Sequence, residues 1–234
     1  MATTKTKSPA TQEDYLKELR EFYWENGFSP DEPALERLAA YAELLVKENE
    51  KINLVSRRDV AKIVENHVFI SAFIAKYLPE KSSTFLDIGS GGGLPGVPLA
   101  IVRPDLRGVL VDSTQKKADA LERIVDKLML ANVEVVGGRV ESPEFIEAHK
   151  AEFDLIVSRA TAPLIILMRY SLPLAKDRAH LFAMKGGDIS EEFQKMNLKY
   201  APHVRKATTY DLHYKPTNVK NEKDKKLVSL EIVK

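Results

Sequence analysis

The stretch Phe85-Leu86-Asp87-Ile88-Gly89-Ser90-Gly91-Gly92-Gly93-Leu94-Pro95-Gly96 decides the fold of this 234-residue chain. It joins a short apolar strand that ends in a carboxylate to a glycine-rich turn and then to the start of a helix. Glycine allows positive φ angles and close approach of a ligand, and proline fits the first helical turn, where its missing N–H costs no bond. The stretch therefore predicts a nucleotide-cofactor pocket in an α/β domain.

Two chemical classes of cofactor fit this loop. Gly91, Gly93 and Gly96 satisfy the dinucleotide fingerprint G-x-G-x-x-G, so the pattern alone leaves NAD open. Asp87 argues against NAD, because a carboxylate beside the helix start repels a pyrophosphate. The same carboxylate attracts the ammonium and sulfonium of S-adenosylmethionine, while Gly89 and Gly91 leave room for its methionine end. Electrostatics therefore favours S-adenosylmethionine.

A second acid, Asp112, follows the next apolar run and is itself followed by Ser113. An acid at the tip of this strand can hold both ribose hydroxyls of an adenosine cofactor. Asp112 supports a nucleoside pocket without separating NAD from S-adenosylmethionine, since both contain the ribose. The plainer alternatives are that Asp112 caps the helix opening at Thr114 and that Asp87 is a turn residue.

Length and composition narrow the class of protein. The chain can form one large domain or a domain with an appended subdomain, and 44% of its residues are hydrophobic. It has no apolar run near the length of a membrane span, and its N-terminus lacks the apolar segment of a secretory signal, so we expect a cytoplasmic protein with no membrane contact. Without cysteine, and with five histidines that show no metal spacing, we expect neither disulfides nor a metal.

Positive charge concentrates near the C-terminus. Over residues 185–234, Lys and Arg outnumber Asp and Glu by 11 to 7, although the whole chain has a net charge of only +1. Much of the excess lies in residues 215–226, with Lys220, Lys223, Lys225 and Lys226. A solvated loop at a hairpin tip explains this charge, and a patch that contacts RNA phosphates is the alternative.

Three parts are predicted along the chain. Residues 1–10 are polar and expected to be disordered, residues 11–80 form an N-terminal helical extension, and residues 81–234 form the cofactor-binding domain. In the extension, a capping box at Thr11 opens a first helix that Gly27 closes. Two more helices follow, over about 31–49 and 59–78.

From residue 84 onward, short apolar runs alternate with helical stretches, which indicates a parallel sheet. The predicted strands are 85–88, 109–111, 133–136, 155–157, 180–184, 207–213 and 227–233. The predicted helices among them are 97–102, 115–130, 143–150, 164–174 and 190–196. Only a basic loop separates the last two strands, so we expect an antiparallel hairpin at the sheet edge. The fold class is therefore Rossmann-like α/β, with a mostly parallel seven-stranded sheet preceded by helices.

Candidate site residues follow the strands at their carboxyl ends, which meet at one edge of an open α/β sheet and bind the ligand there. In chain order they are Asp87 and Gly89, Asp112 and Ser113, Arg139 to Glu141, Ser158 and Arg159, and Lys185.

With its glycine loop, Asp112-Ser113, Arg139-Val140-Glu141, Ser158-Arg159-Ala160 and Ala183-Met184-Lys185-Gly186 in this order, the chain resembles the RsmG (GidB) family of bacterial small-subunit ribosomal RNA methyltransferases. The resemblance covers roughly residues 35–187. Asn53-Leu54, Asp59 and His67 resemble the family's N-L…D…H signature.

The resemblance implies a class I methyltransferase that uses S-adenosylmethionine to methylate N7 of a guanine in 16S ribosomal RNA. Its partner would be ribosomal RNA or the small ribosomal subunit, and we expect a monomer. Gly89, Leu94, Val140, Glu141 and Arg159 fall on the family's cofactor-contact positions. Together with the residues argued above, the expected cofactor-binding set is Asp87, Gly89, Gly91, Gly93, Leu94, Asp112, Ser113, Val140, Glu141 and Arg159.

The implied chemistry requires no catalytic base, because guanine N7 already presents a lone pair and carries no proton. Arg159, Lys185 and Arg139 are instead candidates for positioning the substrate, by holding an RNA phosphate or a guanine edge.

Each of these assignments has a structural alternative. Arg139 can simply pair with an acid, and Glu141 can cap the following helix. His67 fits a core histidine better than a catalytic one. Tyr15, Phe22 and Trp24 of the first helix fit core positions better than base stacking.

Two other functions stay open at this point. An NAD-dependent oxidoreductase would use the fingerprint glycines, although no Tyr-x-x-x-Lys pair is evident for hydride transfer. A catalytically inactive RNA-binding ribosome-assembly factor would use the basic C-terminus. Departures from the family pattern motivate this second alternative: Ile70-Ser71 stands where an Asp-Ser pair is usual, and the C-terminal strands lack the usual Arg-His.

Overall fold

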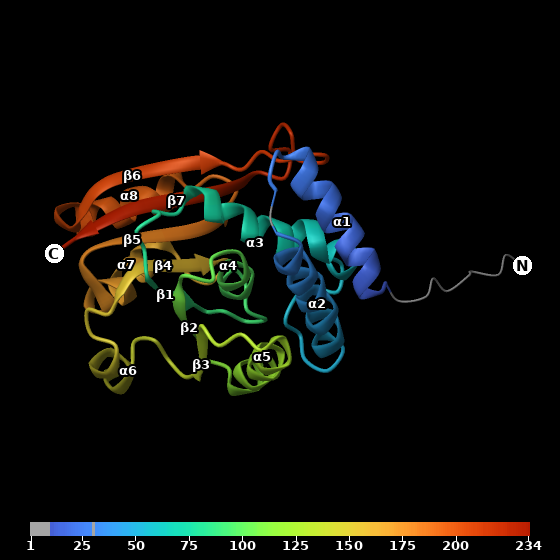
Figure 1. Cartoon of the computed structure of the whole chain (residues 1–234). Helices are drawn as coiled ribbons and strands as arrows, with labels where there is room; N and C mark the ends of the chain where they lie inside the picture. The colour runs from blue at the N-terminus through green and yellow to red at the C-terminus, as the bar shows by residue number, and fades with distance from the viewer. Residues whose placement is uncertain (1–9, 30) are drawn as a thin grey trace, which may run out of the picture.

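The computed structural model describes residues 10–29 and 31–234, so the expected disorder of the N-terminus falls almost wholly outside the described residues. Seven strands form one sheet in the order β3-β2-β1-β4-β5-β7-β6 (Figure 1). Strands β1 to β5 pair in parallel, and β7 runs antiparallel to both β5 and β6. The strands are β1 Thr84–Ile88, β2 Arg107–Asp112, β3 Val133–Gly137, β4 Phe153–Arg159, β5 Ala175–Gly186, β6 Val204–Asp211 and β7 Lys225–Val233. The predicted sheet with its antiparallel edge hairpin is confirmed.

Helices cover both faces of this sheet, which explains why its central strands are apolar along their whole length. On β1, Phe85 packs into the core under one set of helices, while Leu86 and Ile88 pack into the core under the other. The helices of the first face are α4 Gly96–Val102 and α5 Gln115–Leu128, and those of the second are α6 Pro143–Ala148, α7 Leu164–Leu174 and α8 Ser190–Tyr200. The glycine loop lies where β1 gives way to α4.

The N-terminal helices share a core with the sheet. Helix α1 spans Gln12–Glu25 and α2 spans Glu32–Asn49. The capping box is present, since Thr11 Oγ1 accepts from Asp14 N and the Asp14 carboxylate accepts from Thr11 N. Buried residues of both helices belong to the same hydrophobic cluster as Phe85, Leu99 and Leu121. Helix α2 lies beside α4 and α5, and α1 packs on the outer side of α2 (Figure 1).

The prediction of one regular helix over residues 59–78 is wrong. Residues 59–78 form a series of short turns instead: a 3₁₀ turn Val60–Lys62, a π-helical turn Val64–Phe69, a short α3 Ile70–Phe73 and a second 3₁₀ turn Ile74–Tyr77. A π turn widens the helix, and such turns concentrate at functional sites. Here it accompanies burial of the polar side chains of Glu65 and His67 and leaves the carbonyl oxygens of Asn66 and His67 to accept from Arg159. The contact with a distant arginine therefore accompanies the irregular geometry.

The aromatic residues of α1 differ in their burial. Tyr15 and Phe22 are buried as predicted, but Trp24 is 76% exposed, so its assignment to the core is wrong. It follows Phe22 by two positions, which places it about 200° around the helix from that buried residue. No helix among the described residues is long and apolar enough to cross a membrane.

Candidate cofactor and substrate site

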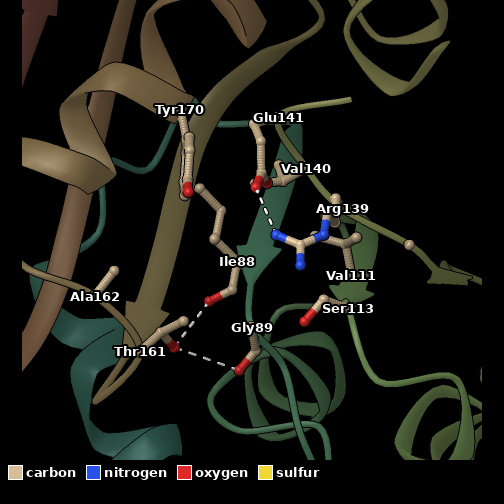
Figure 2. A pocket seen from close by; sticks show the side chains of 11 residues that line it. Ile88, Gly89, Val111, Ser113, Arg139, Val140, Glu141, Thr161, Ala162 and Tyr170 are labelled. Atoms are coloured by element: carbon tan, nitrogen blue, oxygen red, sulfur yellow. Dashed lines mark hydrogen bonds and ion pairs between the residues drawn. The ribbon is translucent and has the colours of Figure 1, made fainter. Parts of the chain in front are cut away.

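A crevice opens at the carboxyl ends of β1, β2 and β4, where the sequence placed the site. It consists of two adjoining hollows of about 210 Å³ and 430 Å³, which share Gly89, Ser113 and Thr161. The smaller hollow is shown in Figure 2, with Val140 and Glu141 on one side and Tyr170 on another. The larger one continues over the glycine loop to Asp112, Arg159 and His67. The volume of the larger hollow falls in the range of small-molecule sites.

Glycine is required at three positions of the loop for different reasons. Gly89, Gly91 and Gly93 all have positive φ, at 74°, 56° and 97°. Gly89 and Gly91 line the crevice, and a Cβ at Gly91 would meet no atom within 4 Å, which leaves space above it for a ligand. Gly93 does not line either hollow. A Cβ there would lie 2.5 Å from Val97 Cγ2 and 2.7 Å from Leu121 Cδ1, so Gly93 serves packing and is not positioned for the predicted cofactor contact.

Six N–H groups of the loop are already hydrogen-bonded within the protein. Gly89 N and Ser90 N donate to Val111 O, Gly93 N and Leu94 N donate to Ser90 O, Gly91 N donates to Asp112, and Gly96 N donates to Asp87. A dinucleotide site uses free N–H groups at the helix start to hold the pyrophosphate. Because these donors are already used, the loop offers little to a phosphate.

Asp87, predicted to contact the cofactor ammonium, lies beneath the loop and opens into neither hollow. Its side chain is fully buried. Oδ2 accepts from Gly96 N at 2.8 Å, and Oδ1 has no hydrogen-bond partner among the described residues. Side chains alternate along a strand, so Asp87 shares the face of Phe85 under α4. Asp87 thus occupies the N–H group at the start of α4, and this leaves less there for a phosphate to bind.

Burial also perturbs the acidity of this carboxyl. Desolvation raises the pKa of Asp87 to about 7, and the negative charge of Asp112 acts in the same direction. The Gly96 N–H and the Arg159 charge oppose this rise in pKa.

Asp112 and Ser113 lie where the sequence placed them, at the tip of β2 and on the crevice wall. Asp112 Oδ2 accepts from Gly91 N and Oδ1 accepts from Thr114 N, both at 2.9 Å. These bonds join the two cofactor loops and fix the carboxylate. An ionised carboxylate has about four lone-pair sites, so both oxygens can still accept from ribose hydroxyls.

The turn after β3 forms the wall of the smaller hollow. Val140 is buried against it, and Glu141 accepts from Arg139 Nη1 at 3.2 Å beside it (Figure 2). Ser142, and not Glu141, caps α6 by accepting from Phe145 N. Glu141 therefore remains at the crevice, whereas Arg139 is an exposed arginine with an acidic partner, as its structural alternative predicted.

Arg159 is held by four hydrogen bonds to the π turn and α3. Its guanidinium donates to the carbonyl oxygens of Asn66 and His67, to Ser71 Oγ and to His67 Nδ1, at 2.7 to 3.4 Å. Because arginine only donates, His67 Nδ1 accepts and the histidine proton lies on Nε2. Burial and the Arg159 charge lower the pKa of His67 to about 4, so the ring is neutral at neutral pH. His67 thus positions Arg159, and it also lines the crevice.

The lysines expected to meet RNA are mostly paired within the protein. Lys185 Nζ donates to Ala162 O and Glu192, both at 2.6 Å. In the basic loop, Lys223 pairs with buried Glu65 and Lys226 pairs with Asp224. Only Lys220 and Lys215 of this loop extend into solvent without an ion pair among the described residues.

Two crevice residues, Thr161 and Tyr170, and one residue beneath the loop, Tyr41, carried no signal in the sequence. Thr161 and Tyr170 line the smaller hollow beside Ile88 (Figure 2). Tyr41 of α2 donates from its buried hydroxyl to Gly92 O at 2.8 Å and so supports the loop from below. A tyrosine in an amphipathic helix looks like any core residue, and only the fold shows that it touches the loop. The described residues contain no cluster of acids and histidines that could hold a metal.

Comparison with known families gives one match over most of the chain. Residues 34–220 match the family model GidB, described as rRNA small subunit methyltransferase G. A protein named Ribosomal RNA small subunit methyltransferase G from Chlorobaculum tepidum is 41% identical over 181 residues, which cover 77% of this chain and 81% of that protein. A protein of the same name from Neisseria meningitidis is 42% identical and covers 66% of this chain and 72% of its own length.

Solved structures resemble the fold at low identity. The O-methyltransferase TomG from Streptomyces achromogenes, in complex with SAM, has a TM-score of 0.57 at 17% identity and covers 96% of this chain and 100% of its own. An O-methyltransferase from Bacillus cereus in complex with SAH has a TM-score of 0.55 at 19% identity, covering 83% and 91%. These likenesses support a class I methyltransferase fold.

Proposed function

The chain belongs to the GidB family, rRNA small subunit methyltransferase G, and we propose on that premise that it transfers a methyl group from S-adenosylmethionine to N7 of a guanine in 16S ribosomal RNA. The observation that supports this most strongly is the crevice, which runs without interruption from the glycine loop past Asp112 to Val140 and Glu141. The family match and the crevice lead to the same cofactor.

The residues of the crevice fit S-adenosylmethionine part by part. Asp112 and Ser113 would hold the ribose hydroxyls, and Val140 with Glu141 would hold the adenine. The open space over Gly91, beside Gly89, would receive the methionine end. Most N–H groups of the loop are bonded within the protein, which favours a cofactor without phosphates and argues against an NAD-dependent oxidoreductase.

The chemistry needs positioning more than proton transfer. When bound, S-adenosylmethionine supplies a methyl group on a cationic sulfur: the N7 lone pair forms the new bond, the sulfur keeps the old bonding pair, and the positive charge moves to the purine. No proton is released in this transfer. The chain therefore has to hold the base, exclude water and fix the angle of approach, which alone can lower a barrier by several kcal/mol (up to about 7–11). Arg159, fixed by four hydrogen bonds at the crevice, is placed to support this geometry.

The proposed partner is small-subunit ribosomal RNA, either free or within the subunit, and the proposed functional form is a monomer. The exposed lysines Lys215 and Lys220 would contribute phosphate contacts, whose strength should fall as salt rises.

Methyl transfer to RNA tests this function. The protein is incubated with methyl-labelled S-adenosylmethionine and with small ribosomal subunits or 16S RNA from a bacterium whose corresponding gene is deleted. Borohydride reduction and aniline treatment then cleave the RNA at N7-methylguanosine. We expect label in the RNA and cleavage after one guanine. Binding of the RNA without label would indicate the assembly factor instead, and saturable binding of NAD without binding of S-adenosylmethionine would indicate the oxidoreductase.

A further inference from the structure

A third hollow of about 210 Å³ adjoins the cofactor crevice and shares Arg159 and Ala160 with it. It lies at the carboxyl end of β5, between that strand, the start of β7 and Ile70 of α3. Ala160 has a φ of 52°, a strained backbone angle for a residue with a side chain. Strain of this kind persists where the surrounding structure enforces it, often at sites of ligand contact. The hollow thus adjoins the proposed cofactor crevice at a strained turn.

The side chains that line this hollow are hydrogen-bond donors or apolar groups. Its polar side chains are those of Arg159, Lys185, Lys225 and Lys226, and its apolar ones are those of Ile70, Ala160 and Met184. None of the lining side chains is a carboxylate, amide or hydroxyl. A ligand group that accepts hydrogen bonds fits these side chains, while an amino group would find no acceptor among them.

Of the four cations, Lys225 is the one available to a ligand. Lys185 pairs with Glu192, and Lys226 pairs with Asp224. The terminal nitrogens of Arg159 already donate hydrogen bonds to the π turn and to Ser71. Lys225 Nζ donates to the neutral hydroxyl of Tyr214 at 3.2 Å. No carboxylate of the described residues lies within ion-pair distance of it.

Lys225 is also poorly hydrated. Burial, with a smaller contribution from the Arg159 charge, lowers the pKa of Lys225 to about 8. An ammonium that has lost water and has no acidic partner gains more from a new acceptor than a solvated one does.

Building on the proposed function, we propose that this hollow receives the target base and that Lys225 selects guanine over adenine by donating to O6. Both purines carry N7, and on the same edge they differ at position 6, where guanine has a carbonyl acceptor and adenine an amino donor. Lys225 would therefore form a hydrogen bond with guanine O6 and would oppose the amino group of adenine.

The same arrangement leaves N7 free to react. An arginine that bonded O6 and N7 together, the common contact to guanine, would occupy the lone pair that has to attack the methyl group. Arg159 is kept from this contact because its terminal nitrogens are committed to Asn66, His67 and Ser71. A lysine is a single-point donor and can address O6 alone.

A substitution at Lys225 combined with a change of the base tests this assignment. The substrates are small-subunit RNAs, assembled by ligation, that carry either guanine or 2-aminopurine at the mapped position. 2-Aminopurine keeps N7 and has no group at position 6. For guanine, Lys225→Met should lower kcat/KM of methyl transfer by roughly tenfold or more. For 2-aminopurine, Lys225→Met should match the unmodified protein. If neither protein methylates 2-aminopurine measurably, binding of the two RNAs in the presence of S-adenosylhomocysteine should follow the same pattern.

Lys206→Met is the matched control, because Lys206 is exposed on β6 near the opposite end of the sheet. It should leave both substrates unchanged, and S-adenosylmethionine affinity measured by calorimetry should be unaltered in both variants. An equal loss on guanine and 2-aminopurine would overturn the proposal, since it would reduce Lys225 to a phosphate contact or a structural residue. If the unmodified protein fails to methylate guanine at all, the proposed function fails instead, so the two failures are distinct.

Discussion

At the scale of the residue, Asp87 is a fully buried carboxyl that contacts the glycine loop. It lies under the loop with one oxygen bound to Gly96 N and the other without a partner among the described residues. In that position it binds the N–H group at the start of α4 and ties the loop to β1. Its influence on cofactor choice is therefore indirect, through the loop it shapes and the anion it disfavours.

The raised pKa of Asp87 makes stability depend on pH in a defined direction. Between its ordinary pKa of 3.8 and its folded pKa of about 7, the folded protein binds a proton that the unfolded chain does not. The free energy of unfolding should therefore fall as pH rises through this window, by up to about 1.4 kcal/mol per pH unit from this group.

Asp87→Asn removes this titration while keeping an acceptor for Gly96 N. Urea unfolding at several pH values should show the variant gaining stability relative to the unmodified protein from pH 4 to pH 7. Asp177→Asn, at an exposed position, serves as control and should not change the profile. Parallel profiles for Asp87→Asn and the unmodified protein would show that the carboxyl is not protonated in the fold.

At the scale of the element, α2 packs against the glycine loop. Tyr41 donates to Gly92 O, and a Cβ on Gly92 would lie only 2.5 Å from Leu45 Cδ1, so the helix supports the loop directly. An N-terminal helix thus determines the shape of a loop more than forty residues away in the sequence.

Tyr41→Phe should weaken this support without changing the packing. Leaving the buried Gly92 carbonyl without its donor should cost about 1–3 kcal/mol of stability. If about 1 kcal/mol of this affects the loop in the bound state, the Kd for S-adenosylmethionine should rise about fivefold in calorimetry. Tyr200→Phe in α8, far from the loop, is the control. An unchanged Kd in Tyr41→Phe would mean that the loop keeps its shape without α2.

The π turn is the second element that connects distant parts of the chain. Glu65 is buried in it, accepts from Thr217 Oγ1 at 2.6 Å and pairs with Lys223. These contacts hold the basic loop against the N-terminal helices, beside Arg159. The loop is thus anchored to the protein, and the charge pattern alone suggested either a solvated loop or an RNA patch.

Glu65→Ala should release this loop. Because Lys223 is partly exposed, we expect a loss of about 1–3 kcal/mol, less than that for a fully buried pair. Trypsin should then cleave after Lys220 faster than in the unmodified protein. Glu50→Ala, at an exposed position, should leave cleavage unchanged. Equal cleavage rates for Glu65→Ala and the unmodified protein would show that other contacts suffice to hold the loop.

At the scale of the whole molecule, the sequence predicts the sheet well and the contacts within the site poorly. Apolar runs separated by helical stretches place β1, β2 and β4 side by side, so the meeting of Asp112, Val140 and Arg159 follows from topology. Strand alternation would even have placed Asp87 on the face of Phe85, away from the ligand. The partners of Arg159 and Lys223 lie about 90 and 160 residues away, so no local pattern reveals the π turn or the pairing of the basic loop.

A crystal structure of the protein with S-adenosylhomocysteine would test the central claim most directly, because it measures where the cofactor sulfur lies relative to both hollows. We predict that adenine lies beside Val140 and Glu141 and that the ribose hydroxyls bind Asp112. The sulfur should face the Arg159–Ala160 turn, toward Lys225. An empty crevice, or a sulfur directed away from that turn, would contradict it.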